Sequence, residues 1–283
     1  MPEESKIVIG VSEASYLRPL WYGLRNSEGD LDLRVDIPAQ LPITLQQRTG
    51  NLRCAFLSPI DYARHGGDYC IVPGVAVSSV NRSNTIQLFI NADVRDIEKI
   101  AVDIRVTSEI ILAKVILAEK YPSQNGSKRA LQFLPMMPNR SEMLRKADAA
   151  LIVNLHPVER MEEKPFALDL VEEWNDMTGL PYVHGCWVGH DEEGLADVIG
   201  ALLRSKEQGV SHLDQIAEML AAENKLSREF ASQYLSTFSY EFGELEQESM
   251  TEFMKYAYFH GILPDVPDLS FFEVEPPKLP SIN

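Results

Sequence analysis

The stretch CAFLSPIDY (Cys54–Tyr62) joins a short apolar run to a proline that opens a helical pattern. It predicts a buried strand followed by a helix beginning at Pro59. The same order occurs earlier in the chain: KIVIG (Lys6–Gly10) predicts a strand, Ser15–Leu24 a helix, and Leu31–Ile37 the next strand. Strands and helices that alternate at this spacing indicate a parallel sheet, so the first part of the chain is predicted to be an α/β unit.

A second α/β unit follows the first. Ile86–Ile90 is predicted to be a strand that crosses between the two units, and a strand beginning at Lys99 leads into a long helix from Ser108 through Glu119. Further expected elements are strands at 128–134, 149–154 and 180–188 and helices at 141–147 and 168–178. Residues 191–261 have a helical pattern throughout, and the proline-rich tail after Pro264 is expected to be an extended strap or partly disordered.

This order of elements predicts two lobes joined by two crossings. We expect lobe I to comprise residues 1–88 and 187–283, and lobe II to comprise residues 89–186. The fold class is therefore α/β, with sheets flanked by helices. A ligand is expected in a cleft between the lobes, where strand ends and helix N-termini meet.

The composition excludes several classes of partner. The 283 residues carry a formal net charge of −16, which disfavours binding to nucleic acid or to anionic membrane surfaces. Cys54, Cys70 and Cys186 are far apart and form neither a CxxC pair nor a Cys/His cluster, so no zinc site is expected. The acidic start of the chain has no leader pattern, and no run of about 18 apolar residues occurs, so a cytoplasmic protein without a membrane span is expected.

Hydroxyl side chains occur where predicted strands pass into helices. Ser58 lies at such a point in the first unit, and Thr107 and Ser108 lie at another in the second. Hydroxyls and unpaired amides at a helix N-terminus can hold a carboxylate. An ordinary helix cap is the alternative, and it explains Ser58 more readily than it explains two adjacent hydroxyls.

Other polar residues are placed near the expected cleft. Thr85 precedes the crossing strand, and Arg82 and Arg105 are the nearest candidates for contact with a carboxylate, although either can be an ordinary surface arginine.

Several titratable residues are candidates for acid–base chemistry. Glu13 and Tyr16 lie in the first strand-to-helix turn, His156 follows a predicted strand, and His184 lies in the predicted return strand. Histidine can transfer protons near neutral pH, but a single histidine in such a place is more often structural. No P-loop, GxGxxG, HExxH or GxSxG motif occurs, which argues against nucleotide-binding, zinc-peptidase and serine-hydrolase functions.

Five stretches resemble the chorismate dehydratases of menaquinone biosynthesis. They are IGVSEASYLRPLWYGL at 9–24, FLSPIDYA at 56–63, AVDIRVTSEIILAKVILAE at 101–119, DLVEEWNDMTGLPYVHGCW at 169–187 and YEFGELEQESMTEFMKYAYFHGIL at 240–263. The resemblance implies the two-lobed, type II periplasmic-binding-protein-like fold with mixed sheets. It also implies the removal of water from chorismate, a small carboxylate metabolite, to give 3-[(1-carboxyvinyl)oxy]benzoate in the futalosine pathway, with no metal or redox cofactor. Ser58, Thr85, Thr107 and Ser108 would then hold the substrate.

The chain departs from the family pattern at two places. Tyr16 takes the position of a family Asn that faces substrate, and Asn154-Leu155-His156 replaces a family Gly-Asp. Tyr16, Glu13 or His156 would then supply the reactive group, with Asn154 and Arg105 among the residues that contact substrate. There are two alternatives: a non-catalytic protein that binds a small carboxylate, and a sister enzyme of the same pathway.

Overall fold

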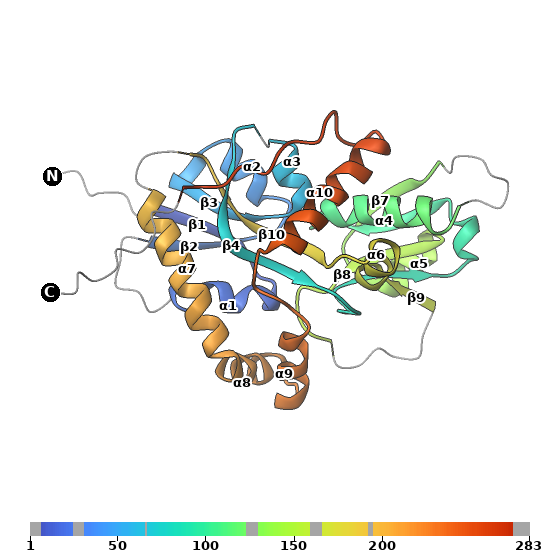
Figure 1. Ribbon diagram of the computed structural model, residues 1–283. Coiled ribbons are helices and arrows are strands. Elements are labelled where there is room, and N and C mark those ends of the chain that lie inside the picture. Colours follow the sequence, from blue (N-terminus) through green and yellow to red (C-terminus); the bar gives the residue numbers. More distant parts are fainter. Residues whose placement is uncertain are drawn as a thin grey trace, which may run out of the picture.

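A computed structural model describes residues 7–24, 31–65, 67–122, 130–158, 166–191 and 195–273. Two five-stranded sheets lie side by side and form the centres of two lobes (Figure 1). In order across the first sheet, the strands are β2 (Leu31–Asp36), β1 (Ile7–Ser12), β3 (Leu52–Leu57), β10 (Tyr182–Gly189) and β4 (Cys70–Ser79). In the second sheet they are β7 (Gln132–Met136), β6 (Lys99–Asp103), β8 (Ala149–Val153), β5 (Ile86–Ile90) and β9 (Phe166–Asp169).

Both sheets are mixed. β1 is parallel to β2 and β3, and β6 is parallel to β7 and β8, as expected where helices connect consecutive strands. β10 is antiparallel to β3 and β4, and β5 is antiparallel to β8 and β9, because these strands lie beside the points where the chain crosses between the lobes. The predicted two-lobed α/β fold is confirmed.

The chain crosses between the lobes twice, from β4 to β5 and back to β10. All of β5 lies in the second sheet and all of β10 in the first. The division into lobes at residues 88/89 and 186/187 stays a prediction, because a sheet does not by itself mark where one rigid body ends.

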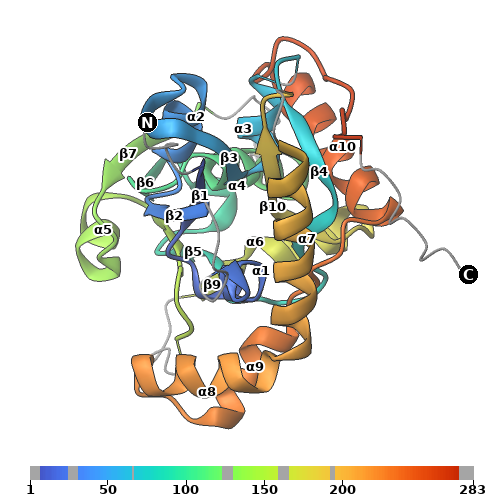
Figure 2. The same ribbon diagram turned by 90° about the vertical axis from the view of Figure 1, so that its left-hand side faces the viewer.

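Helices cover the faces of both sheets. The short helices of the first lobe are α1 (Arg18–Trp21), α2 (Leu41–Gln46) and α3 (Pro59–Ala63), and those of the second are α4 (Ser108–Glu119), α5 (Arg140–Lys146) and α6 (Leu170–Thr178). The C-terminal helices are α7 (Leu195–Ser211), α8 (Leu213–Asn224), α9 (Arg228–Ser236) and α10 (Glu244–Phe259). Single 3-10 turns are η1 (Ser15–Leu17), η3 (Thr49–Asn51) and η4 (Val94–Asp96). Figure 2 shows that α8 and α9 extend away from both sheets.

Helix α10 lies along the junction of the lobes, against α3 and β10 on one side and α4 on the other. Its Phe253 packs edge-on against Trp174 of α6, with ring centroids 5.5 Å apart, and both rings contact Tyr182 of β10. The Trp174 indole N–H donates to the Ser249 hydroxyl at 3.2 Å. A buried aromatic group therefore ties elements of the two lobes together.

Four details of the predicted secondary structure were wrong. Ser15–Leu24 is not one helix, because η1 and α1 divide it. Residues 237–243 interrupt the helical region, and Ser239 there forms a bridge with Ser78. Strands β4 and β9 were not predicted. The expected extended strap beyond Pro264 is, by contrast, present as far as the tail is described: Phe271 bridges Ile71, and the Tyr62 hydroxyl donates to the Asp268 carbonyl at 2.8 Å.

Candidate active site

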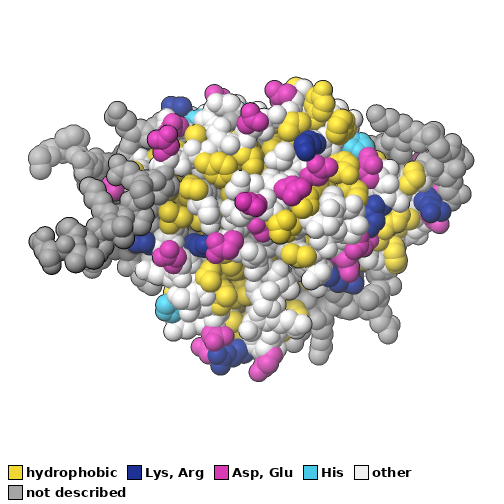
Figure 3. Space-filling view, in the orientation of Figure 1, with side chains coloured by type: hydrophobic (Ala, Val, Ile, Leu, Met, Phe, Trp, Pro, Cys, Tyr) yellow, Lys and Arg dark blue, Asp and Glu magenta, His cyan; other side chains and the backbone are white. Residues whose placement is uncertain are grey.

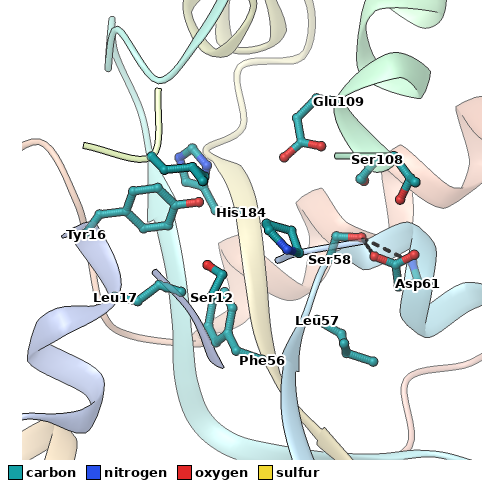
Figure 4. Close-up of a pocket in the computed structure, with 13 residues that line it drawn as sticks. Ser12, Tyr16, Leu17, Phe56, Leu57, Ser58, Asp61, Ser108, Glu109 and His184 are labelled. Atoms are coloured by element: carbon teal, nitrogen blue, oxygen red, sulfur yellow. Dashed lines mark hydrogen bonds between the residues drawn. The ribbon is translucent and has the colours of Figure 1, made fainter. Parts of the chain in front are cut away.

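A pocket lies where the two lobes meet at their strand ends. Its lining from the first lobe is Ser12, Tyr16, Leu17, Pro38, Phe56, Leu57, Ser58, Asp61 and His184, and from the second it is Thr107, Ser108, Glu109 and Leu155. Figure 4 shows the α4 residues on one side of this space, opposite Tyr16, Ser12 and His184. The position between the lobes is the predicted one.

The lobes touch directly around the pocket, which is therefore closed. The Ser15 backbone N–H donates to the Leu155 carbonyl at 2.7 Å, and the Ala39 N–H donates to the Arg105 carbonyl at 3.1 Å. The enclosed volume is about 40 Å³. The free space is about 480 Å³ when the part that is open to solvent is included. A ligand with a six-membered ring therefore does not fit in this space unless the surrounding residues move apart.

Two hydroxyls at the N-terminus of α4, those of Thr107 and Ser108, line this pocket and do not cap the helix. Thr107 is the N-cap residue but makes no side-chain cap, and the Ser108 hydroxyl is buried without a hydrogen bond, although it lies close to the Tyr182 hydroxyl. Ordinary capping therefore accounts for neither. The first-turn amides of a 12-residue helix and these hydroxyls form a site suited to a carboxylate.

Ser58 differs from the α4 pair because its hydroxyl makes hydrogen bonds within its own helix cap. It caps α3, accepting from the Asp61 N–H at 3.2 Å and donating to the Asp61 carboxylate at 2.6 Å. Ser58 still lines the pocket, but part of its predicted role is the structural one of a helix cap. Burial raises the pKa of the Asp61 carboxyl, which the Ser58 hydrogen bond partly offsets.

Tyr16 and His184 form the opposite wall. The Tyr16 ring stacks on Phe238 at 5.0 Å and lies 5.2 Å from the His184 ring. Burial raises the pKa of the Tyr16 phenol and lowers the pKa of His184 to about 3, so both side chains are neutral at pH 7. His184 also shares a 2.7 Å hydrogen bond with the Ser79 hydroxyl, which orients its ring.

Three of the predicted site residues lie beside the pocket and are not among its lining residues. His156 shares a 2.9 Å hydrogen bond with the Ser15 hydroxyl across the lobes. Arg105 is bound to the buried Asp103, with Nη2 and Oδ2 2.7 Å apart, and lies 3.9 Å from Glu13. These contacts place Glu13, Arg105 and His156 in the junction between the lobes.

Two more of the predicted residues, Thr85 and Asn154, belong to the crossing between the lobes. The Thr85 hydroxyl is buried and shares a 2.5 Å hydrogen bond with Ser83, and the Asn154 side-chain amide donates to the Asn84 carbonyl at 2.7 Å. Neither lines the pocket in this closed form. Their contact with substrate stays a prediction.

Glu109 is the site residue that sequence reasoning missed. It follows Thr107 and Ser108 in a stretch that was already singled out, and its carboxylate enters the pocket (Figure 4). Burial, with smaller effects from the charges of Asp61 and Asp103, raises its pKa to about 7. The lining residues include no Lys or Arg, so nothing of opposite charge offsets the carboxylate there.

Other features of the described residues exclude few classes of function. On the face shown in Figure 3, Asp and Glu side chains are scattered among apolar ones without a gathering of Lys and Arg, in agreement with the net charge of −16. Within the described ranges no group of three His, Cys, Asp or Glu side chains is arranged to hold a metal ion. Among the helices described above, none has the length and apolar character needed to cross a membrane.

Comparisons with known proteins agree with this architecture. Solved structures with the same fold include a protein from Archaeoglobus fulgidus (TM-score 0.68, 16% identity, covering 92% of this chain and 100% of that one). Another is the periplasmic aliphatic sulphonate binding protein SsuA from Escherichia coli (TM-score 0.65, 15% identity, covering 93% and 95%). A Candida albicans protein described as having the generic periplasmic binding protein fold also matches (TM-score 0.59, 14% identity, covering 96% and 99%).

Sequence comparison is more specific than fold comparison. The chain is 23% identical over 262 residues to a chorismate dehydratase from Thermus thermophilus, covering 87% of this chain and 93% of that protein. A sequence model of the family described as menaquinone biosynthesis matches residues 7–259, which include both lobes and the pocket between them. The chain therefore belongs to the menaquinone-biosynthesis family.

Proposed function

We propose that this protein is a carbon–oxygen lyase that removes water from chorismate, or from a close analogue, to form 3-[(1-carboxyvinyl)oxy]benzoate. The observation that carries the proposal is the pair of hydroxyls at the α4 N-terminus that line an enclosed pocket and do not cap the helix, in a relative of chorismate dehydratase. This site can hold a carboxylate without a lysine or arginine.

The reaction suits a pocket of this kind. Dehydration of a cyclohexadiene creates an aromatic ring, so it is strongly favourable once it starts. The protein must hold the substrate, move one proton from carbon and help one hydroxyl to leave. When the lobes close, Tyr16 and His184 on one side and α4 on the other would exclude bulk water from the ring.

The direct test is turnover. Purified protein incubated with chorismate is expected to yield a product lighter by one water, detected by mass spectrometry, with the ultraviolet absorbance of a substituted benzoate. Absence of conversion at high enzyme concentration would overturn the proposal.

Ser108→Ala tests the carboxylate site. Because a hydrogen bond to a charged group contributes about 1.5–3 kcal/mol, we expect the KM for chorismate to rise at least tenfold. Ser211→Ala is the matched control, since this exposed hydroxyl donates within its own helix to the Gln208 carbonyl. An unchanged KM in Ser108→Ala would show that the carboxylate does not bind at α4.

A non-catalytic binding protein is the second candidate, and one departure from the family favours it. Tyr16 stands where the family has an Asn that faces substrate, and its phenol is buried and protonated. Calorimetry with chorismate separates the two functions: binding with full recovery of unchanged chorismate supports this candidate, and conversion excludes it.

A further inference from the structure

Glu109 is placed so that its carboxylate is enclosed by both lobes. It is the second residue of α4, and Figure 4 shows its side chain directed into the space between His184, Tyr16 and Ser58. The residues that line this pocket belong to both lobes. The enclosure of Glu109 therefore depends on how the two lobes lie together and not on α4 alone.

The carboxylate of Glu109 has no partner of opposite charge. Throughout the described ranges it makes no salt bridge and no hydrogen bond to another residue, and only its own backbone N–H favours the charged form. The charges of Asp61 and Asp103 disfavour a further negative charge there. An unpaired carboxylate in an enclosed site is costly, so Glu109 binds a proton near neutral pH, where its pKa of about 7 lies.

The other titratable groups in or beside this space cannot exchange a proton so readily. Burial keeps the Tyr16 and Tyr182 phenols protonated and His184 neutral near pH 7, because it raises the pKa of each phenol and lowers that of the imidazole. Asp61 is held by Ser58 on the α3 side. Of the lining residues, Glu109 is thus the one whose proton is both present and removable near neutral pH.

We propose that Glu109 is a catalytic residue that both gives and takes the proton in the elimination. This inference rests on the proposed function. As the ring C–O bond breaks, its electron pair goes to the hydroxyl oxygen, which takes the Glu109 proton and leaves as water. As the neighbouring ring C–H bond breaks, its electron pair forms the new ring double bond, and its proton passes to the other Glu109 oxygen. The carboxyl group ends as it began.

One carboxyl can serve both steps because of the substrate's geometry. In chorismate the hydroxyl on C4 and the hydrogen on C3 lie on the same face of the ring. A carboxyl group facing that side can therefore reach both, with one oxygen for each. The two carboxylates of chorismate also favour protonated Glu109, because binding a dianion beside an ionised carboxylate is unfavourable.

Glu109→Gln tests the assignment, because glutamine keeps the size of the side chain and cannot transfer the proton. We expect kcat to fall by about 10² to 10⁴ fold, the range of general acid–base catalysis, while KM does not rise. The wild-type kcat is expected to decrease above the pKa of Glu109 in the complex, and Glu109→Asp is expected to recover part of the rate with the same pH dependence. Glu119→Gln is the matched control on α4, since Glu119 pairs with His260 outside the pocket.

The outcomes separate this inference from the proposed function. If the wild type converts chorismate and the kcat of Glu109→Gln is within about threefold of the wild-type value, Glu109 does not have the proposed role. The dehydratase proposal would still stand. Absence of turnover by the wild type would overturn the dehydratase proposal itself.

A second measurement does not depend on turnover. Calorimetric titration with 3-[(1-carboxyvinyl)oxy]benzoate at pH 8, in Tris and in phosphate buffer, is expected to show uptake of about one proton per ligand by the wild type and none by Glu109→Gln. Equal uptake by both proteins would contradict the assignment.

Discussion

Gly209→Ala is expected to lower the free energy of unfolding by about 3 kcal/mol or more, at the upper end of overpacking effects. A Cβ atom on Gly209 would lie 1.8 Å from the Pro19 carbonyl oxygen and 2.7 Å from the Pro19 Cα. These are backbone atoms, so α7 and α1 would have to separate. Because α1 directly follows the turn that carries Tyr16, the same displacement is expected to disturb the pocket. Urea denaturation followed by circular dichroism measures the loss.

Gly200→Ala provides the control on the same helix. A Cβ there would meet only the Arg204 guanidinium, at 3.1 Å, and that flexible side chain can move. Because alanine favours a helix over glycine by about 1 kcal/mol, Gly200→Ala is expected to leave stability unchanged or raise it. Equal stability of the two variants would show that α7 and α1 do not pack this closely.

The parts of the site that were predicted are those that depend on strand order. Ser58, Thr107 and Ser108 were identified because each follows an apolar run and precedes a helical one, and parallel strands bring such points to one edge of a sheet. The structure places all three in one pocket. The same reasoning located Tyr16 in the first turn.

The parts that were missed depend on the direction of individual side chains. Glu109 adjoins Ser108, yet successive helix residues point about 100° apart, and no sequence pattern shows which of them the opposite lobe will cover. Arg105 was expected to contact substrate, but its partly buried pair with Asp103 holds the guanidinium beside the pocket. Strand β4 contains Pro73 and Gly74, two residues that are uncommon inside strands, so its sequence does not have the pattern typical of a strand.

Glu109→Gln is expected to stabilise the folded protein at alkaline pH while it lowers kcat. The folded-state pKa of Glu109, about 7, lies above the ordinary value of 4.5, so its contribution to stability is fully present below pH 4.5 and is lost as pH rises through 7. A tenfold difference in proton affinity between the folded and unfolded states corresponds to about 1.4 kcal/mol. Because the side chain keeps some contact with solvent through the pocket, we expect a gain of about 1–3 kcal/mol at pH 8.

At pH 4.5 the gain should vanish, since wild-type Glu109 is then protonated in the folded state. His184 has the opposite dependence: its folded pKa of about 3 lies below the ordinary 6.5, so it costs stability as pH falls below 6.5. Between pH 4.5 and 6.5 the two groups offset one another in the wild type, and Glu109→Gln removes the compensation. Urea denaturation of the variant should therefore show stability that falls steadily on acidification, whereas the wild type and Glu119→Gln change less. A gain of the same size at pH 8 and at pH 4.5 would instead mean that glutamine packs better than glutamate. The ionisation of Glu109 would then not be the cause of the difference in stability.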